Sequence, residues 1–453
     1  MIARTAETVV PHHDLKAYFL RRLLLIPLTL LGITALVFSI IRSAPGGPVV
    51  NAIASMTGGD GGKRSRAQAN VTITAAQVLD IEEKFHRDKS AVRAYCEWLG
   101  VLPRDIEKGG MEFPKEALKV DVPVPGTTDA VTVIRNPADN TVQMRPPEGQ
   151  EDIPAWEKRM EGWEARLRTP EEQAARWQKW VPGVELKELP QYRAVIYRPG
   201  FDGLLQGSLG RSIKYQDQVG TMIVERLPVS LYFAAMEMIL IYGICIPLGI
   251  LKAIRHRTFL DNASSFAVFA GYAVPGYALG SLLIVFLGNK LGWFPIRGFT
   301  GDDFETLSPI GKAKDLLEHT VMPLACYLIG AFALMTMMVK NNLMDNLAAD
   351  YVRTATAKGV SYPTAVFRHA FRNSIIPIAT TIGTNLALVL GGSILIERVF
   401  DINGFGLLQF TAVLDQDEPV IMGVLFFAAA LTALGKVISD LCVALVDPRV
   451  SYK

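Results

Sequence analysis

Residues 350–396 decide the fold class of this chain, and they read DYVRTATAKGVSYPTAVFRHAFRNSIIPIATTIGTNLALVLGGSILI. The first part has the pattern of a short basic helix, a break at Gly359, a second basic segment and a proline at Pro377. The last part, residues 373–396, holds 24 residues without a charge. A helix needs about 20 apolar residues to cross the roughly 30 Å hydrocarbon core of a bilayer, so we expect this run to span a membrane.

Five further runs outside this stretch have the same character. They cover residues 23–41, 227–251, 262–289, 320–339 and 419–446, and only the second and the last contain charged residues. Buried helices of soluble proteins look similar, but six such runs in one chain of 453 residues, half of them hydrophobic, favour membrane helices. We therefore predict an all-α polytopic protein with transmembrane helices at 21–42 and at about 227–251, 264–289, 320–340, 373–396 and 419–446.

The distribution of Lys and Arg predicts the orientation of these helices. The apolar core of the first run is longer than that of a signal peptide, which favours a retained anchor. Basic residues gather in and directly after the N-terminal segment 1–20, after the second span and in the loop 341–372, whereas the charges of residues 397–418 are mostly acidic. Because basic loops stay in the cytoplasm, both termini and the loop 341–372 are expected there. The long segment 43–222 is then extracytoplasmic.

This long segment has its own secondary-structure patterns. Residues 74–100 are predicted to form a helix, and alternating valines between residues 118 and 144 predict an antiparallel meander. Trp156, Met160, Trp163 and Leu167 have the spacing of one amphipathic helix, and Thr169 followed by Pro170 predicts the start of another. The expected fold is therefore an α+β domain. Four of the six tryptophans lie between residues 156 and 180, and we interpret them as core residues, with a docking surface as the alternative.

No catalytic or metal-binding pattern stands out. Residues 57–64 resemble a phosphate-binding loop, but Thr57 replaces its first glycine and Arg64 replaces the Ser or Thr that binds magnesium. The six histidines are scattered, and the four cysteines provide no disulfide framework. With a net charge of +2, nothing in the composition points to nucleic acid. We therefore expect no metal site, no cofactor in this chain and no enzymatic activity of its own.

Charged residues inside the predicted spans mark possible polar contacts in the membrane. Lys436 and Asp440 are four residues apart on one helix and are expected to neutralise each other. Glu237 lies in the middle of the second span without a partner nearby in sequence. Two interpretations remain open for it: a place along a polar translocation path, or a hydrogen bond to a neighbouring helix.

The basic loop closely resembles the coupling loop, or EAA motif, of ABC importer permeases. Arg353-Thr354-Ala355 stands at the Glu-Ala-Ala positions, and Gly359 matches the motif glycine. The 18-residue distance from Gly359 to Pro377 is similar to that of the oligopeptide, dipeptide and nickel branch. Further matches are Gly207-Ser-Leu-Gly-Arg-Ser212, Glu225-Arg-Leu-Pro-Val-Ser230, Leu291-Gly-Trp-Phe-Pro295, Glu397-Arg-Val-Phe400 and Asp447-Pro-Arg449. Ala44-Pro-Gly-Gly-Pro48 and Gly271-Tyr-Ala-Val-Pro275 look most like the Yej-type (microcin C and peptide) permeases.

The resemblance implies half of a transporter in the bacterial inner membrane. Such permeases pair with a second, homologous permease, with two cytoplasmic ATPases that hold ATP and Mg, and with an extracytoplasmic solute-binding protein. By analogy, the ATPase-coupling residues are Asp350, Arg353, Thr354, Ala355, Lys358, Gly359, Arg368 and Arg372. The segment Asn403, Gly404, Phe405 and Gly406 resembles the element that contacts the binding protein, although its glycines are also consistent with a plain turn.

The chain departs from the family at about residues 101–198, where the family continues promptly into the Gly-Ser-Leu-Gly-Arg-Ser element. We interpret this insertion as a docking or lid domain for the binding protein. The resemblance favours peptides or peptide-like solutes, and nickel, sugars or opine-like solutes remain alternatives within the family. Two rival classes are a membrane-anchored sensor or scaffold that acts through the outer domain, and a stand-alone secondary carrier.

Overall fold

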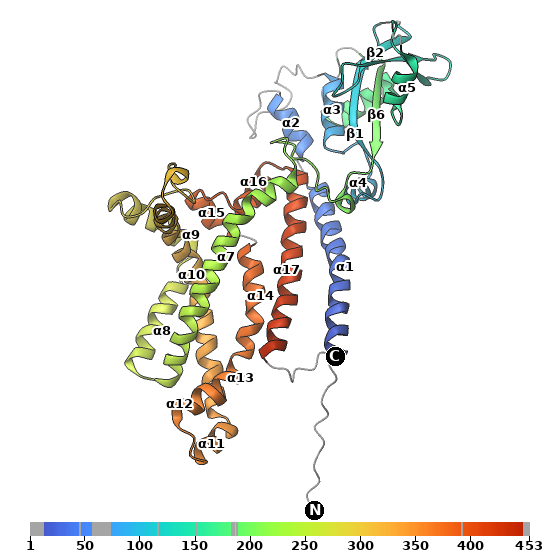
Figure 1. Cartoon of the computed structure of the whole chain (residues 1–453). Helices are drawn as coiled ribbons and strands as arrows, with labels where there is room; N and C mark the ends of the chain where they lie inside the picture. Colours follow the sequence, from blue (N-terminus) through green and yellow to red (C-terminus); the bar gives the residue numbers. More distant parts are fainter. Residues whose placement is uncertain are drawn as a thin grey trace, which may run out of the picture. The chain divides into compact units, whose positions relative to one another are not determined.

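The computed structural model of the chain describes residues 13–44, 47–56, 74–115, 117–149, 152–182, 186, 189–390 and 393–446. It divides into two compact units (Figure 1). The helical unit contains residues 1–34, 221–415 and 421–453, and the mixed unit contains residues 35–220 and 416–420. Residues 57–64, which include the rejected phosphate loop, and the Asp447-Pro-Arg449 motif lie outside the described residues.

Four helices in the described part of the chain are long and apolar enough to cross a membrane. They are α1 (His13–Ser43), α7 (Val219–Ile254), α10 (Pro309–Ala348) and α17 (Glu418–Val446). These helices contain the predicted first, second, fourth and sixth spans. Helix α10 extends beyond the predicted span 320–340 at both ends, so the first residues of the predicted loop 341–372 are still helical. The loop itself begins after Ala348.

The third predicted span is bent rather than straight. Helix α8 (Phe259–Tyr272) is followed by α9 (Gly276–Leu283) and a π-helical turn (Ile284–Lys290), and the two parts meet at 90°. The break falls at Pro275, which cannot donate a backbone hydrogen bond and disfavours helical geometry in the residue before it. Counted as one span, this pair raises the number of candidate spans to five.

Most of the fifth predicted span, 373–396, is helix α14 (Ile376–Leu390), and its first two residues belong to the short helix α13 (Arg372–Ser374). Its last residues belong instead to the short helix α15 (Ile394–Phe400), which is followed by α16 (Phe405–Leu414). Helices α14 and α17 approach closely because small residues face each other. A side chain on Gly383 would meet the backbone of Gly435 and Ser439, and one on Gly435 would meet Gly383 and Ala387. Small residues permit this close helix packing in membrane proteins.

The mixed unit contains two antiparallel sheets of three strands. In the first, the order is β1 (Arg104–Glu112), β6 (Arg193–Gly200) and β5 (Glu164–Arg168). In the second, it is β2 (Lys119–Pro123), β3 (Ala130–Arg135) and β4 (Val142–Arg145). The second sheet confirms the predicted meander. Its alternating valines lie in one core, where Val122, Val131 and Val133 are fully buried.

The helices of the mixed unit correct two predictions. They are α2 (Pro48–Met56), α3 (Ala75–Lys84), α4 (Ala91–Leu99), α5 (Ile153–Met160) and α6 (Pro170–Trp180). The single helix expected over residues 74–100 is two helices, because His86 takes a positive φ of 51° between them. The expected helix through Leu167 ends at Met160, because Gly162, with φ 83°, starts a turn into strand β5. The predicted cap is confirmed, since the Thr169 side chain accepts from the Glu172 backbone N–H.

The tryptophans pack in two cores of this unit, as the sequence indicated. Trp156 and Trp163 lie in the core between the sheets, and Trp177 is buried against α2 and α3. Trp180 is partly buried at the second core. Because α6 lies within residues 101–198 but packs on helices that precede them, this segment shares its core with the rest of the unit.

Candidate functional site

The basic loop forms a compact group of short helices at one end of the helical unit (Figure 1). After α10, the chain forms α11 (Asp350–Ala357), α12 (Tyr362–Thr364), a π-helical turn (Ala365–Phe371) and α13 (Arg372–Ser374). Helix α14 then leads away from the loop. The predicted sequence of helix, glycine break and second basic segment is therefore present.

Gly359 ends helix α11 in a way that other residues tolerate poorly. Its N–H donates to the Thr356 carbonyl at 2.9 Å, and the Val360 N–H donates to the Ala355 carbonyl at 3.2 Å. This pair of bonds is a Schellman motif, which requires a left-handed residue after the helix. Gly359 has φ 90°, and the space around it is open. The requirement for glycine is therefore one of backbone conformation and not of space.

An apolar cluster on the inner side of the loop attaches the loop to the ends of α7 and α10. Its buried members are Ala253, Leu343, Val352, Ala365, Val366 and Ala370. Val352 faces inward from α11, and Ala253 and Leu343 come from the last turns of α7 and α10. Ser374 adds to this attachment by donating to the Asn342 carbonyl of α10 at 3.1 Å, and within the loop Asn373 donates to the Tyr351 hydroxyl at 3.1 Å. The loop and the helix ends below it are thus packed together.

The opposite face of the loop is exposed and basic. The sequence-predicted residues Asp350, Arg353, Thr354, Lys358, Gly359, Arg368 and Arg372 are all exposed, and Ala355 is half-buried. Three aromatic side chains accompany them: Tyr351, Tyr362 and Phe367 are 41%, 54% and 55% exposed. The sequence analysis missed these aromatics, although apolar rings within a basic cytoplasmic loop were a visible signal. Exposed rings beside Arg are typical of protein interfaces.

Glu237 lies in the middle of α7 and is buried, with 6% of its surface exposed. Within the described residues, its Oε2 atom has no hydrogen-bond partner. A buried carboxylate oxygen without a hydrogen bond is costly. Both interpretations of Glu237, a place along a translocation path and a hydrogen bond to a neighbouring helix, stay predictions.

The segment Asn403–Gly406 forms the turn that starts helix α16. The Glu397 carboxylate accepts from the Leu407 N–H at 2.7 Å, and a side chain on Gly404 or Gly406 would collide with this carboxylate. Gly404, Phe405 and Gly406 are buried, whereas Asn403 is exposed. The glycines therefore make room for Glu397 inside the chain, and Asn403 alone of the four is accessible.

Two other motifs from the sequence have clear structural roles. In the mixed unit, Ser212 donates its hydroxyl to Asp417 at 2.6 Å, and the N–H groups of Ile213 and Lys214 also donate to this carboxylate. In the helical unit, the Ser230 hydroxyl accepts from the Phe405 N–H at 3.0 Å. Both serines are buried, so these motifs hold segments that are distant in sequence.

The predicted pairing of Lys436 with Asp440 is wrong. Asp440 pairs instead with Arg22, and it accepts a hydrogen bond from the Tyr18 hydroxyl at 2.9 Å. Both partners come from α1, so the charge on α17 is balanced by another helix. Local spacing favoured the i, i+4 pair, but an arginine with a fork of donors is the better partner for a carboxylate.

Comparison with known proteins identifies a family for the C-terminal half. The family described as "Binding-protein-dependent transport system inner membrane component" matches residues 245–452. The chain is 37% identical over 247 residues to the inner membrane ABC transporter permease protein YejB of Escherichia coli O157:H7, covering 54% of this chain and 68% of that protein. It is 34% identical over 264 residues to the oligopeptide transport system permease protein AppB of Bacillus subtilis, covering 58% and 81%. It is 34% identical over 248 residues to the dipeptide transport system permease protein DppB of Lactococcus lactis, covering 54% and 77%.

Proposed function

The chain belongs to the family of binding-protein-dependent transport system inner membrane components, and from this premise we propose that it carries peptides or peptide-like solutes across the bacterial inner membrane. Its function is that of a permease subunit of an ABC importer, and ATP hydrolysis takes place in separate ATPase subunits. The peptide class follows from the relatives, which are named as oligopeptide and dipeptide permeases. The structural observation that carries the permease function is the basic loop, whose outer face is exposed and whose inner face packs on the ends of α7 and α10.

The residues of this loop would form the contact with the ATPase subunits. Arg353, Thr354 and Lys358 on α11 present an exposed surface, and Arg368 and Arg372 extend it. Among the described residues, the one ion pair that these cations make is Arg353 with Asp350, at 3.8 Å and exposed to solvent. Exposed pairs of this kind contribute little to stability. The positive charge is therefore available to a partner protein.

The membrane topology has six spans with both termini in the cytoplasm. The four long helices supply the first, second, fourth and sixth spans, the bent pair α8–α9 the third, and α14 the fifth. The basic loop 341–372 lies in the cytoplasm, and residues 43–222 lie outside it. The excess of Lys and Arg in the loop supports this orientation.

The part of the mixed unit that follows α1, with the insertion 101–198, is an extracytoplasmic docking or lid domain for the solute-binding protein. Its separate cores and its sheets support an independent role for the region that includes the insertion 101–198. Asn403 is the exposed member of the second candidate contact with that protein. The whole importer would contain a second homologous permease, two ATPase subunits that bind ATP and Mg, and the binding protein.

Glu237 would line the translocation path. Its buried position in the middle of a span supports this role, as does its Oε2 atom, which has no hydrogen-bond partner in the described residues. A carboxylate there would attract the ammonium group of a peptide during transit. Glu237→Gln, which keeps the shape and removes the charge, should lower uptake of peptides with a free N-terminus more than that of N-acetylated peptides. An equal change for both would remove Glu237 from the path.

Reconstitution into liposomes tests the function as a whole. The complete assembly, with the binding protein and a peptide, should take up the peptide only when ATP is present on the ATPase side. The chain alone should transport nothing under a sodium or proton gradient. Gradient-driven transport by the chain alone would identify a secondary carrier and contradict the proposal, and so would a complete assembly that takes up nickel but no peptide.

A further inference from the structure

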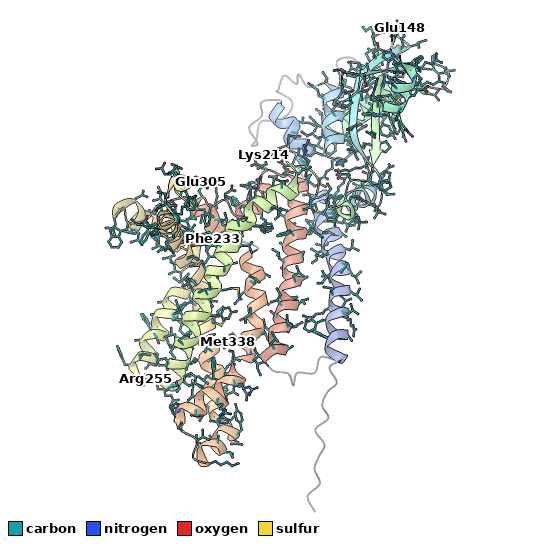
Figure 2. All side chains as sticks on the ribbon, viewed as in Figure 1. Glu148, Lys214, Phe233, Arg255, Glu305 and Met338 are labelled. Atoms are coloured by element: carbon teal, nitrogen blue, oxygen red, sulfur yellow. The ribbon has the colours of Figure 1, made fainter. Side chains whose placement is uncertain are left out.

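Three charged residues are buried together in the helical unit, close to the base of the basic loop. Lys252 is fully buried, Asp261 is 2% exposed and Lys340 is 7% exposed. They come from the end of α7, the start of α8 and the second half of α10. The end of α7, where Lys252 lies, is marked in Figure 2 by Arg255, the residue that directly follows this helix. We call these three residues the buried triad.

Asp261 is the centre of the triad. The Lys340 ammonium group donates to both of its carboxylate oxygens, at 2.7 and 2.8 Å. The Arg257 N–H donates to one of these oxygens at 3.1 Å, and the His256 ring nitrogen lies 3.3 Å from it. Each oxygen thus has a cationic or N–H neighbour. The ion pair of Asp261 with Lys340 joins α8 to α10, and its two hydrogen bonds fix the relative position of the two side chains.

Lys252 joins α7 to the same part of α8. Its ammonium group donates to the Asp261 carbonyl at 3.0 Å, to Ser264 at 2.8 Å and to Ser265 at 2.7 Å. These three acceptors use all of its N–H groups. The triad therefore has two positive charges and one negative charge, and hydroxyl and carbonyl oxygens compensate the excess.

A buried charge network of this kind is weak evidence for stability. Withdrawing charges from water costs about as much as their attraction returns, and apolar side chains often replace such groups without loss. What the network does provide is a fixed register between three helices. A fixed register matters when helices move relative to one another, so we look for the role of the network in such a movement.

The triad is continuous with the base of the basic loop. Ala253 follows Lys252, and Leu343 lies one turn after Lys340; both belong to the apolar cluster that holds the loop. One turn away on the other side, a side chain on Gly249 would collide with Val339, so α7 and α10 are in direct contact there. A movement of the loop that displaces the end of α10 therefore also displaces Lys340.

We propose that Lys252, Asp261 and Lys340 are positioning residues that transmit movement of the basic loop to α7 and α8. The inference rests on the proposed function, since it assumes that ATPases move the loop. The apolar cluster attaches the loop to α7 and α10, but α8 has no member in that cluster. Lys252 joins α7 to α8, and the pair of Asp261 with Lys340 joins α8 to α10, so these polar bonds include α8 in the movement.

The test uses the complete transporter and a neutral double variant, Asp261→Asn with Lys340→Met. Each single variant leaves one buried charge without its partner and is expected to assemble poorly. The double variant removes one positive and one negative charge and leaves Lys252 with its three oxygen acceptors, so it should assemble and keep the basal ATPase rate. Its ATPase stimulation by loaded binding protein should fall about fivefold or more, because the ion pair that joins α8 to α10 is lost. Lys340→Arg, which preserves the charge and its donors, should retain at least half of the stimulation.

A matched control lies near the other end of the same helix. Lys314 and Glu318 form an exposed i, i+4 pair on α10 at 3.5 Å, and Lys314→Met with Glu318→Gln removes it. This control should have wild-type stimulation. Wild-type stimulation in the double variant of the triad, or an equal loss in the control, would overturn the inference. A wild-type complex that shows no stimulation at all would instead contradict the proposed function.

Discussion

The basic loop and the mixed unit both carry many charges, but they use them in opposite ways. In the loop, Arg353, Lys358, Arg368 and Arg372 are exposed, and Arg353 alone has an ion pair in the described residues. In the mixed unit, the charges on helices α3 and α6 are paired with each other. The comparison teaches that charge by itself does not mark a functional surface, and the exposed loop cations stay candidates for contact with a partner protein.

The network of ion pairs in the mixed unit centres on helix α3. Glu82 is 1% exposed and accepts from Arg176 at 2.6 Å and from Lys179 at 2.8 Å. Arg176 also donates to Glu83 at 3.0 Å, and Arg168 pairs with Glu83. Although burial raises the pKa of Glu82, hydrogen bonds from Lys179 and its neighbours hold this pKa below its usual value. These groups bind α6 to α3, so their role is structural.

The largest expected difference between the two regions concerns two glycines with the same backbone strain. Gly359 in the loop and Gly126 in the β2–β3 turn have φ 90° and 73°, and both are surrounded by open space. Valine at either position costs about 1–3 kcal/mol of strain. Gly359→Val should lower ATP-driven uptake about tenfold or more, whereas Gly126→Val should change uptake less than about twofold.

Uptake and ATPase stimulation of both glycine variants should be measured in the same vesicles, with the amount of assembled complex as the control. A sensor that acts through the mixed unit would be indifferent to Gly359→Val. Equal losses in the two variants would show that strain alone, and not the place of the loop in the mechanism, causes the effect.

The second prediction concerns the core of the mixed unit. Trp177 is 2% exposed, and Trp177→Ala should lower the free energy of unfolding of this unit by about 3–5 kcal/mol through the cavity it leaves. Val92, on α4, is 75% exposed and provides a control: Val92→Ala should change it by less than about 0.5 kcal/mol. Limited proteolysis of the full protein reports the difference. Similar protease resistance in the two variants would contradict the described core.

The third prediction is a pH dependence that belongs to the mixed unit. Burial, together with the charges of Lys89 and Arg104, lowers the pKa of His86 to about 4. The unfolded chain binds a proton at this histidine near pH 6.5 and the folded chain does not, so stability falls as the pH drops from about 6.5 to 4. His86 contributes about 1–2 kcal/mol to this fall.

His86→Asn removes this titration and suits the positive φ of 51° at that position. Thermal unfolding of the full protein in detergent should depend less on pH in this range for the variant than for the wild type. Parallel curves for the two proteins would show that His86 is not protected from protonation.

The smallest effect is expected for an exposed ion pair of the mixed unit. Lys119 and Glu148 are 62% and 86% exposed and lie on the second sheet and the turn after it. Because solvent screens such a pair, Lys119→Met should leave the melting temperature and uptake unchanged. A measurable loss of uptake would give this surface a role in contact with a partner protein and weaken the contrast between the two regions.

Local signals predicted the parts of the fold that depend on neighbouring residues. The alternating valines predicted the meander, Thr169 the start of α6, and Gly359 the end of α11. Two local signals were present but not used: Gly162 interrupts the apparent stripe of Trp156 and Leu167, and Pro275 bends the third span. Both breaks could have been predicted from residues that restrict or free the backbone.

Contacts between distant residues could not be predicted from the sequence. Asp261 and Lys340 are 79 positions apart, and Arg22 and Asp440 are 418 apart. Which helices become neighbours depends on the packing of the whole unit, and no periodic pattern of residues predicts it. The exposed side of the loop was predicted through its resemblance to a family, whereas its apolar base required the structure.

The most direct test of the account asks on which side of the membrane the two regions lie. Thr354→Cys on α11 and Lys119→Cys in the mixed unit place a thiol at exposed positions, in a chain whose native Cys96, Cys245, Cys326 and Cys442 are replaced. A membrane-impermeant thiol reagent should label the cysteine at 354 only from the cytoplasmic side and the one at 119 only from the other. The cysteine at 354 should also cross-link to an ATPase subunit. Labelling of both from the same side would contradict the assignment of the basic loop as the place where ATPases drive this permease.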